Sequence, residues 1–135
     1  MSTEQDEAPS RTRTVRWEDP AALPAAAATM SGLEFLVAVA EGRIAPPPIM
    51  ATLRIRALEA DAGRVAFECD PDESLYNPLG TVHGGVACAL LDTAAACAGH
   101  STLAVGLGYT SIDLHVQYLR PVPVSYTHLT LPTKA

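Results

Sequence analysis

The stretch Asn77-Pro-Leu-Gly-Thr-Val-His83-Gly84-Gly85-Val-Ala-Cys-Ala-Leu-Leu-Asp92 is the most informative part of this chain. A His-Gly-Gly turn opens an otherwise apolar helix, and a carboxylate follows nine residues after the histidine. No other residue from Val86 to Gly99 carries a charge. A helix that is apolar almost all round is expected to be buried, whereas an ionised Asp resists burial unless it is partnered. We therefore expect a functional site around Asp92, because such local conflicts are typical of one.

The composition narrows the class of protein. The chain has 135 residues, enough for one domain, and 48% hydrophobic residues, enough for a core. Its formal net charge of -6 argues against nucleic acid as a partner, since phosphate binding needs a basic surface. No apolar run approaches the roughly 20 residues of a membrane span, and the polar N-terminus does not resemble a signal peptide. Three cysteines without metal-ligand spacing are expected to be reduced thiols, which favours a cytoplasmic protein.

Three segments are expected along the chain. Residues 1–30 are predicted to be a disordered tail, because they combine many charges with an alanine-rich run and few large apolar groups. Residues 31–124 carry the periodic apolar pattern of a domain. From about Val124 this pattern ends, Pro132 interrupts the next apolar run, and the sequence resembles translated transposon-end adapter DNA. We predict that residues 125–135 are a non-native tail and that the domain is truncated, while a natural short strand is the alternative.

Within the domain, helical and strand patterns alternate. A first helix is expected over Ser31–Gly42, which has a capping-box pattern at its start and a glycine at its end. Two strands are expected on either side of a turn at residues 60–63, the first of them beginning near residue 52. A long helix should run from about Gly84 to Ala98. The best strand candidate is Tyr109–Arg120, and Thr110 shares the parity of its apolar face, so Thr110 can point towards the long helix.

These motifs resemble those of the PaaI-like hotdog thioesterases. The resemblance rests on Asn77-x2-Gly80-x2-His83-Gly84-Gly85, on Asp92, and on Tyr109-Thr-Ser-Ile-Asp-Leu-x3-Tyr-Leu-Arg-Pro121. It covers about two thirds of the chain, and the predicted order of elements also fits. It implies an α+β hotdog fold, in which a long central helix packs on an antiparallel sheet. The family continues with further long strands, so the fold is expected to be incomplete at the C-terminus.

The resemblance implies hydrolysis of acyl-CoA thioesters to the free acid and coenzyme A. Asp92 is the candidate general base or nucleophile. Gly84 is the candidate oxyanion donor, because backbone N–H groups at a helix N-terminus favour negative charge and glycine leaves room for the substrate. Both residues also have ordinary structural interpretations. Asp92 could be a buried carboxylate satisfied by a neighbouring donor, and Gly84 could serve a tight turn or close packing.

Three supporting residues are predicted. Asn77 resembles the family residue whose amide contacts the thioester carbonyl or a water molecule, although Asn is also common in loops before proline. His83 could orient the turn or assist polarisation, although a lone histidine at a helix start is more often structural. Thr110 matches a family Ser/Thr position that helps to hold the attacking water, and an ordinary strand threonine fits almost as well.

The resemblance places Asp92 across a dimer interface from the oxyanion site of the partner subunit. We therefore expect the intact parent protein to form a dimer or tetramer. No cofactor is expected, since coenzyme A enters as part of the substrate. The acyl group is left open. Two alternatives remain, namely a hotdog hydratase or dehydratase acting on enoyl or hydroxyacyl thioesters, and a non-catalytic dimer that binds acyl-CoA.

Two other kinds of site are disfavoured. A thiol nucleophile would pair Cys88 or Cys97 with His100, but both cysteines lie within the apolar helix, where cysteine is usually a small hydrophobic residue. A metal site would need His83, His100 and His115 together, and their spacing matches no compact ligand set. We therefore expect no metal.

Overall fold

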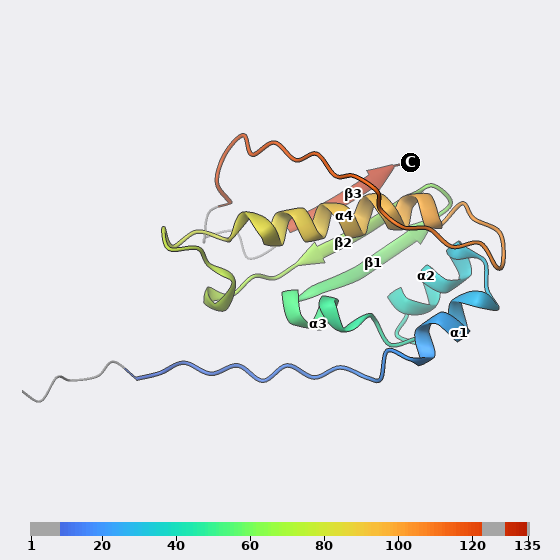
Figure 1. The fold of residues 1–135 in the computed structure, drawn as a ribbon, viewed down its shortest axis with the longest axis horizontal. Helices are drawn as coiled ribbons and strands as arrows, with labels where there is room; N and C mark the ends of the chain where they lie inside the picture. Colours follow the sequence, from blue (N-terminus) through green and yellow to red (C-terminus); the bar gives the residue numbers. More distant parts are fainter. Residues whose placement is uncertain (1–8, 123–128, 135) are drawn as a thin grey trace, which may run out of the picture.

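The computed structural model describes residues 9–122 and 129–134, and it places one long helix across an antiparallel sheet (Figure 1). The elements are α1 (Ala22–Ala28), α2 (Gly32–Ala40), α3 (Pro48–Leu53), β1 (Ile55–Asp61), β2 (Arg64–Cys69), a 3-10 helix (Glu73–Leu75), α4 (Gly84–His100) and β3 (Leu129–Lys134). The strands lie in the order β1-β2-β3, with both pairs antiparallel. Helix α4 contacts β2 and β3, while α2 and α3 contact β1. The predicted α+β arrangement, a long helix on an antiparallel sheet, is confirmed.

Helix α2 begins as its capping pattern predicts. The Ser31 Oγ accepts a hydrogen bond from the Glu34 N–H at 3.3 Å, and the Glu34 carboxylate accepts one from the Ser31 N–H at 2.8 Å. This reciprocal pair satisfies two N–H groups that a helix start would otherwise leave unpaired. Gly42, with φ of 73°, lies just beyond the helix end. The predicted helix is confirmed.

Strands β1 and β2 form the predicted hairpin. Gly63 adopts φ of 75° in the two-residue turn between them, a region of backbone conformation that favours glycine. Its N–H donates to the Ser101 Oγ at 2.8 Å, so the hairpin tip is tied to the C-terminal end of α4. Strand β1 begins at Ile55 rather than near residue 52, because Pro48 starts the short helix α3, and proline is favoured in the first turn.

The core lies between α4 and the sheet. Ala94 and Ala98 of α4 are fully buried, and their small side chains let the helix approach the strands closely. Leu90 on α4 and Val65 and Phe67 on β2 supply the large side chains, each at most 2% exposed. Burial of a side chain of this size stabilises the fold by about 1.5–3 kcal/mol.

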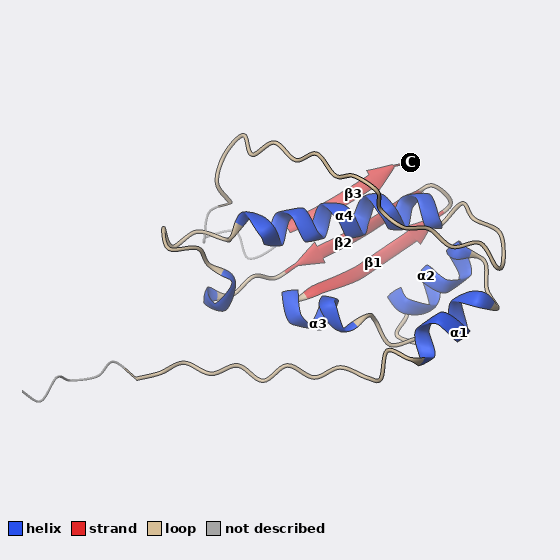
Figure 2. Ribbon diagram, viewed as in Figure 1, coloured by secondary structure: helices blue, strands red, loops and turns tan. Residues whose placement is uncertain are grey.

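The segment that we predicted as the best strand, Tyr109–Arg120, is not a strand. It runs back along α4 as an extended but irregular chain, drawn as loop in Figure 2. The edge of β2 that a further strand could use is taken by β3. The apolar side chains of residues 109–120 therefore have no sheet to pack in and are largely exposed, with Ile112 at 96%. Alternating residues predict an extended backbone, but a strand also needs a partner, which the alternation does not specify.

The chain ends also differ from prediction. Disorder over residues 1–30 is wrong for Ala22–Ala28, which form α1, since alanine has the highest helix propensity. Residues 1–8 lie outside the described residues. Of the tail predicted to be non-native, residues 129–134 form β3, whereas 125–128 and 135 lie outside the described residues. The origin of that tail and the domain boundaries remain predictions.

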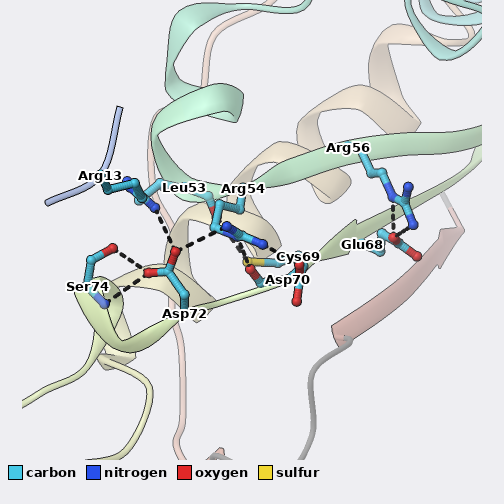
Figure 3. Close-up of polar contacts among 9 residues, drawn as sticks. All are labelled: Arg13, Leu53, Arg54, Arg56, Glu68, Cys69, Asp70, Asp72 and Ser74. Carbon is cyan, nitrogen blue, oxygen red and sulfur yellow. Dashed lines mark hydrogen bonds and ion pairs between the residues drawn. The ribbon is translucent and has the colours of Figure 1, made fainter. Parts of the chain in front are cut away.

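A network of ion pairs and hydrogen bonds stabilises the junction between α3 and β1 (Figure 3). Arg54 has the left-handed conformation, with φ of 56°, and its guanidinium pairs with the carboxylates of Asp70 and Asp72. Hydrogen bonding from Ser74 and the nearby guanidinium groups lower the pKa of Asp72, so this carboxylate stays ionised. Arg13 of the N-terminal segment reaches the same carboxylate at 3.6 Å. The network holds the start of the loop that leads to α4.

Gly32 sits where α2 touches the end of α4. A Cβ at Gly32 would lie 1.8 Å from the His100 carbonyl oxygen, whereas a Cβ at Gly99 would meet nothing within 4 Å. We expect Gly32→Ala to lower the free energy of unfolding by about 1–3 kcal/mol, because the two helices must separate. Gly99→Ala should raise it by at most about 1 kcal/mol, because glycine is unfavourable inside a helix. Urea unfolding measures both changes, and equal effects of the two variants would contradict the packing.

His100 is a titratable group inside the fold. It is 8% exposed, and its ring lies 6.1 Å from that of Phe35 and 4.9 Å from that of Tyr109, between ring centroids. Its Nδ1 has no hydrogen-bond partner among the described residues. Burial lowers the pKa of His100, because the charged imidazolium loses hydration.

This lowered pKa predicts acid sensitivity. Below the ordinary value of 6.5, the unfolded chain binds the proton more readily than the folded one, so stability is complete above that pH and decreases below it. We expect the fall in Tm on acidification through this range to be smaller in His100→Gln than in the wild type. His115→Gln, which changes an exposed imidazole, is the matched control and should behave as the wild type. The same acid dependence in all three proteins would show that His100 does not cause it.

Candidate active site

Asp92 lies in the middle of α4, and its carboxylate is partnered. The side chain is half-buried, and its Oδ1 accepts a hydrogen bond from the Ser111 Oγ at 2.6 Å. Ser111 belongs to residues 109–118, the extended segment that runs along α4 and is hereafter called the return segment. The hydroxyl resolves the conflict that the sequence presents, because a carboxylate within an apolar helix needs a donor.

A pocket of about 380 Å³ opens beside this carboxylate. Its wall on the α4 side comes from Cys88, Ala89 and Asp92. Asp92 lies four residues after Cys88 and three after Ala89, so its side chain shares a helix face with both. The opposite wall comes from residues 111–114 of the return segment. A carboxylate and a hydroxyl thus stand next to apolar surface. Such a pocket can take an apolar group that is attached to a polar, hydrolysable bond.

The N-terminus of α4 is capped by His83. Its Nδ1 accepts a hydrogen bond from the Gly85 N–H at 2.9 Å, and its backbone N–H donates to the Leu75 carbonyl oxygen at 2.9 Å. Within the part of the chain that the structure describes, the Gly84 N–H donates to no protein acceptor. A free N–H at the positive end of a helix dipole is suited to a developing negative charge. In this arrangement the imidazole orients the turn, as a cap does.

Asn77 shapes the loop before this turn. Its side-chain oxygen accepts hydrogen bonds from the N–H groups of Leu79 and Thr81, at 2.9 and 3.1 Å, and its amide donates to the Thr81 Oγ1 at 2.9 Å. Asn commonly folds such turns through its side chain. The amide is therefore engaged inside its own loop, and a contact with substrate would require it to exchange these partners.

The hydroxyl beside Asp92 is not the predicted one. Thr110 is exposed, and its neighbour Ser111 makes the bond to Asp92. The expected parity holds for a regular strand, in which a shift of one residue turns every side chain to the opposite face. The return segment is irregular, so the parity of Tyr109–Arg120 does not apply. The sequence signal for a hydroxyl beside Asp92 was the adjacent pair Thr110-Ser111, because in an irregular segment either side chain can face the helix.

Tyr118 is a further residue at this site that the sequence did not single out. Its hydroxyl donates to the Gly84 carbonyl oxygen at 2.8 Å and lies 2.6 Å from the Cys88 Sγ. Its ring lies against the first residue of α4, since a Cβ on Gly84 would be 3.0 Å from the Tyr118 Cζ. The return segment thus contacts α4 near both proposed reacting groups, through Ser111 at Asp92 and through Tyr118 at Gly84, and the Tyr109 hydroxyl lies 3.8 Å from the Cys97 Sγ further along the helix.

The disfavoured sites gain no support. Cys97 is 9% exposed, and burial raises the pKa of its thiol, which makes it a poor nucleophile. Burial likewise raises the pKa of Cys69 to about 11. Among the described residues, no three His, Cys, Asp or Glu side chains gather in a way that could hold a metal ion. In the same part of the chain, no helix is both long and apolar enough to cross a membrane.

Comparison with known proteins agrees with this fold. Residues 79–129 match the family model of the thioesterase superfamily, a range that includes Gly84, Asp92 and Ser111 but begins after Asn77. A Halobacterium salinarum protein named "Putative esterase" is 36% identical over 78 residues, which are 54% of this chain and 52% of that protein. The chain therefore spans about half the length of this curated relative.

Two solved structures share the fold. One, from Ralstonia eutropha, is titled "putative thioesterase, phenylacetic acid degradation-related protein"; it has a TM-score of 0.62 and 26% identity, covering 70% of this chain and 72% of that one. A thioesterase family protein from Silicibacter pomeroyi has a TM-score of 0.62 and 24% identity, covering 70% and 68%. The sequence match over residues 79–129 and the shared fold show that this chain is similar to thioesterase-superfamily proteins and has their α+β hotdog fold.

Proposed function

We propose that this protein hydrolyses acyl-CoA thioesters, with Asp92 as the reacting carboxylate. The observation that carries the proposal is the Asp92–Ser111 pair, which lines a pocket with apolar walls on a helix of a thioesterase-superfamily fold. The acyl group would occupy the apolar part of this pocket. The free thiols of Cys69, Cys88 and Cys97 fit a proposed cytoplasmic location. No cofactor is needed for this reaction, since coenzyme A belongs to the substrate.

The chemistry requires a nucleophile and an oxyanion site. As a general base, Asp92 would take a proton from water while the hydroxide attacks the thioester carbonyl carbon. The C–S bond then breaks, and the coenzyme A thiolate receives the proton. As a nucleophile, the carboxylate would instead form an anhydride that water opens. In either route the Gly84 N–H would stabilise the oxyanion, and Ser111 would orient the carboxylate.

Geometry along α4 favours a site shared between two chains. Gly84 and Asp92 are eight residues apart on one helix, which corresponds to about 12 Å along its axis. One thioester carbonyl group cannot lie within bonding distance of both. We therefore propose that Asp92 of one chain acts with Gly84 of a second copy, as the family resemblance implies.

Replacing Asp92 tests the reaction. We expect Asp92→Asn to lower kcat/KM at least about 100-fold, because the amide is neither a base nor a nucleophile but keeps the shape of the pocket. Asp61→Asn is the matched control, since this exposed carboxylate at the end of β1 lies outside the pocket. The measurement is thiol release from a panel of aromatic and straight-chain acyl-CoAs.

The same assay separates the alternatives. Equal losses in the two variants would contradict the role of Asp92. Addition of water to an enoyl-CoA without thiol release would indicate a hydratase. Saturable binding with the thioester intact after long incubation would indicate a binding protein.

Mixing two inactive variants tests the shared site. Asp92→Asn lacks the carboxylate, and Gly84→Val blocks the approach to the backbone donor. Each variant alone should be inactive, whereas hybrid dimers contain one intact site. Equal mixing should therefore restore about a quarter of the wild-type activity. Hybrid dimers that form but stay inactive would show that both residues act within one chain.

A further inference from the structure

The first turn of α4 has little to restrain it through its own side chains. It begins with Gly84 and Gly85, and glycine has the greatest backbone freedom of all residues. His83 caps the Gly85 N–H from the preceding residue. The only hydroxyl that reaches the first helical carbonyl comes, among the described residues, from Tyr118 in the return segment, 34 positions later in the chain.

We infer that Tyr118 is a positioning residue for the thioester site, whose hydroxyl fixes the Gly84–Gly85 turn so that the Gly84 N–H keeps its direction. The inference rests on the proposed function, because the Gly84 N–H is the oxyanion donor of that proposal. Tyr118 itself need not touch the substrate. It acts through the carbonyl group to which it donates.

Two contacts make this hydroxyl a fixed point. It lies 2.8 Å from the Gly84 carbonyl oxygen and 2.6 Å from the Cys88 Sγ, one helical turn further along α4. The hydrogen bond with Cys88 raises the pKa of Tyr118, which keeps the phenol protonated and able to donate. The Tyr118 side chain is otherwise largely exposed, so core packing does not determine where its ring lies. The hydroxyl contacts and the close fit on Gly84 determine its position instead.

The same segment serves the other reacting group. Ser111 bonds to Asp92, and Tyr118 bonds to the turn that carries Gly84. Because a displacement of about 1 Å between reacting groups can cost a factor of about 100 in rate, the segment can influence catalysis without supplying a base or an oxyanion donor. It follows that removing the Tyr118 hydroxyl should affect the chemical step more than binding.

The test is Tyr118→Phe, which keeps the ring on Gly84 and removes only the hydroxyl. We expect kcat for thioester hydrolysis to fall about tenfold while KM stays within about twofold, because a lost alignment acts on the transition state. Amide hydrogen exchange at Gly84 and Gly85, followed by NMR, should become several-fold faster. Tyr109→Phe is the matched control, since it removes the other phenol hydroxyl of the return segment and leaves the pocket and the bond to Gly84 in place, and both readouts should stay near the wild type.

Each result is decisive. An unchanged kcat in Tyr118→Phe, or a rise in KM alone, would overturn the positioning role. If Tyr109→Phe reproduced the loss, a general loosening of the return segment rather than the Gly84 contact would be responsible, which also overturns it. If the wild type releases no thiol from any acyl-CoA, the proposed function fails. Unchanged exchange at the two glycines would then reject the positioning separately, and faster exchange would support it.

Discussion

The structure depends on the burial of one apolar helix that contains a charge. Helix α4 must cover the sheet, since almost every residue on it is apolar, yet Asp92 lies in its middle. A half-buried carboxylate beside apolar side chains is stabilised by a hydrogen-bond donor. The chain therefore has to bring a donor to that point of the helix, and the return segment does so with Ser111. The constraint explains why a loop that forms no strand still follows α4 closely (Figure 1).

The candidate site consequently lies between two neighbouring segments, helix α4 and the return segment. Along α4, Gly84 offers a backbone donor at the first turn, and Asp92 offers a carboxylate two turns later. Along the return segment, Tyr118 and Ser111 partner these same positions in reverse order. This pairing is possible because the return segment runs antiparallel to α4. Both proposed reacting groups thus depend on one extended segment that contributes little to the core.

Local signals made much of this predictable. The Ser31–Glu34 capping box, the hairpin turn at Gly63 and the apolar run of α4 each involve residues close in sequence, and the structure contains all three. The return segment was predicted wrongly, because a strand depends on a distant partner and β3 already occupies the edge of β2. The prediction that Thr110 points towards α4 failed for the same reason, since side-chain parity follows from regular strand pairing. The contact of Tyr118 with Gly84 joins residues 34 positions apart, and no periodic pattern reports such a contact.

The two ends of α4 are secured in different ways. Its C-terminal end is built into the body of the fold, where Ser101 holds the hairpin tip and Gly32 packs against His100. Its N-terminal end meets the exposed return segment through the hydroxyl of Tyr118. Thermal stability therefore depends mainly on the C-terminal end of α4, whereas the proposed catalytic groups depend on the return segment. A laboratory selection for altered substrates could vary the exposed positions of the return segment, such as Ile112, and keep Tyr109, Ser111 and Tyr118, while the thermal tolerance of the protein stays nearly constant.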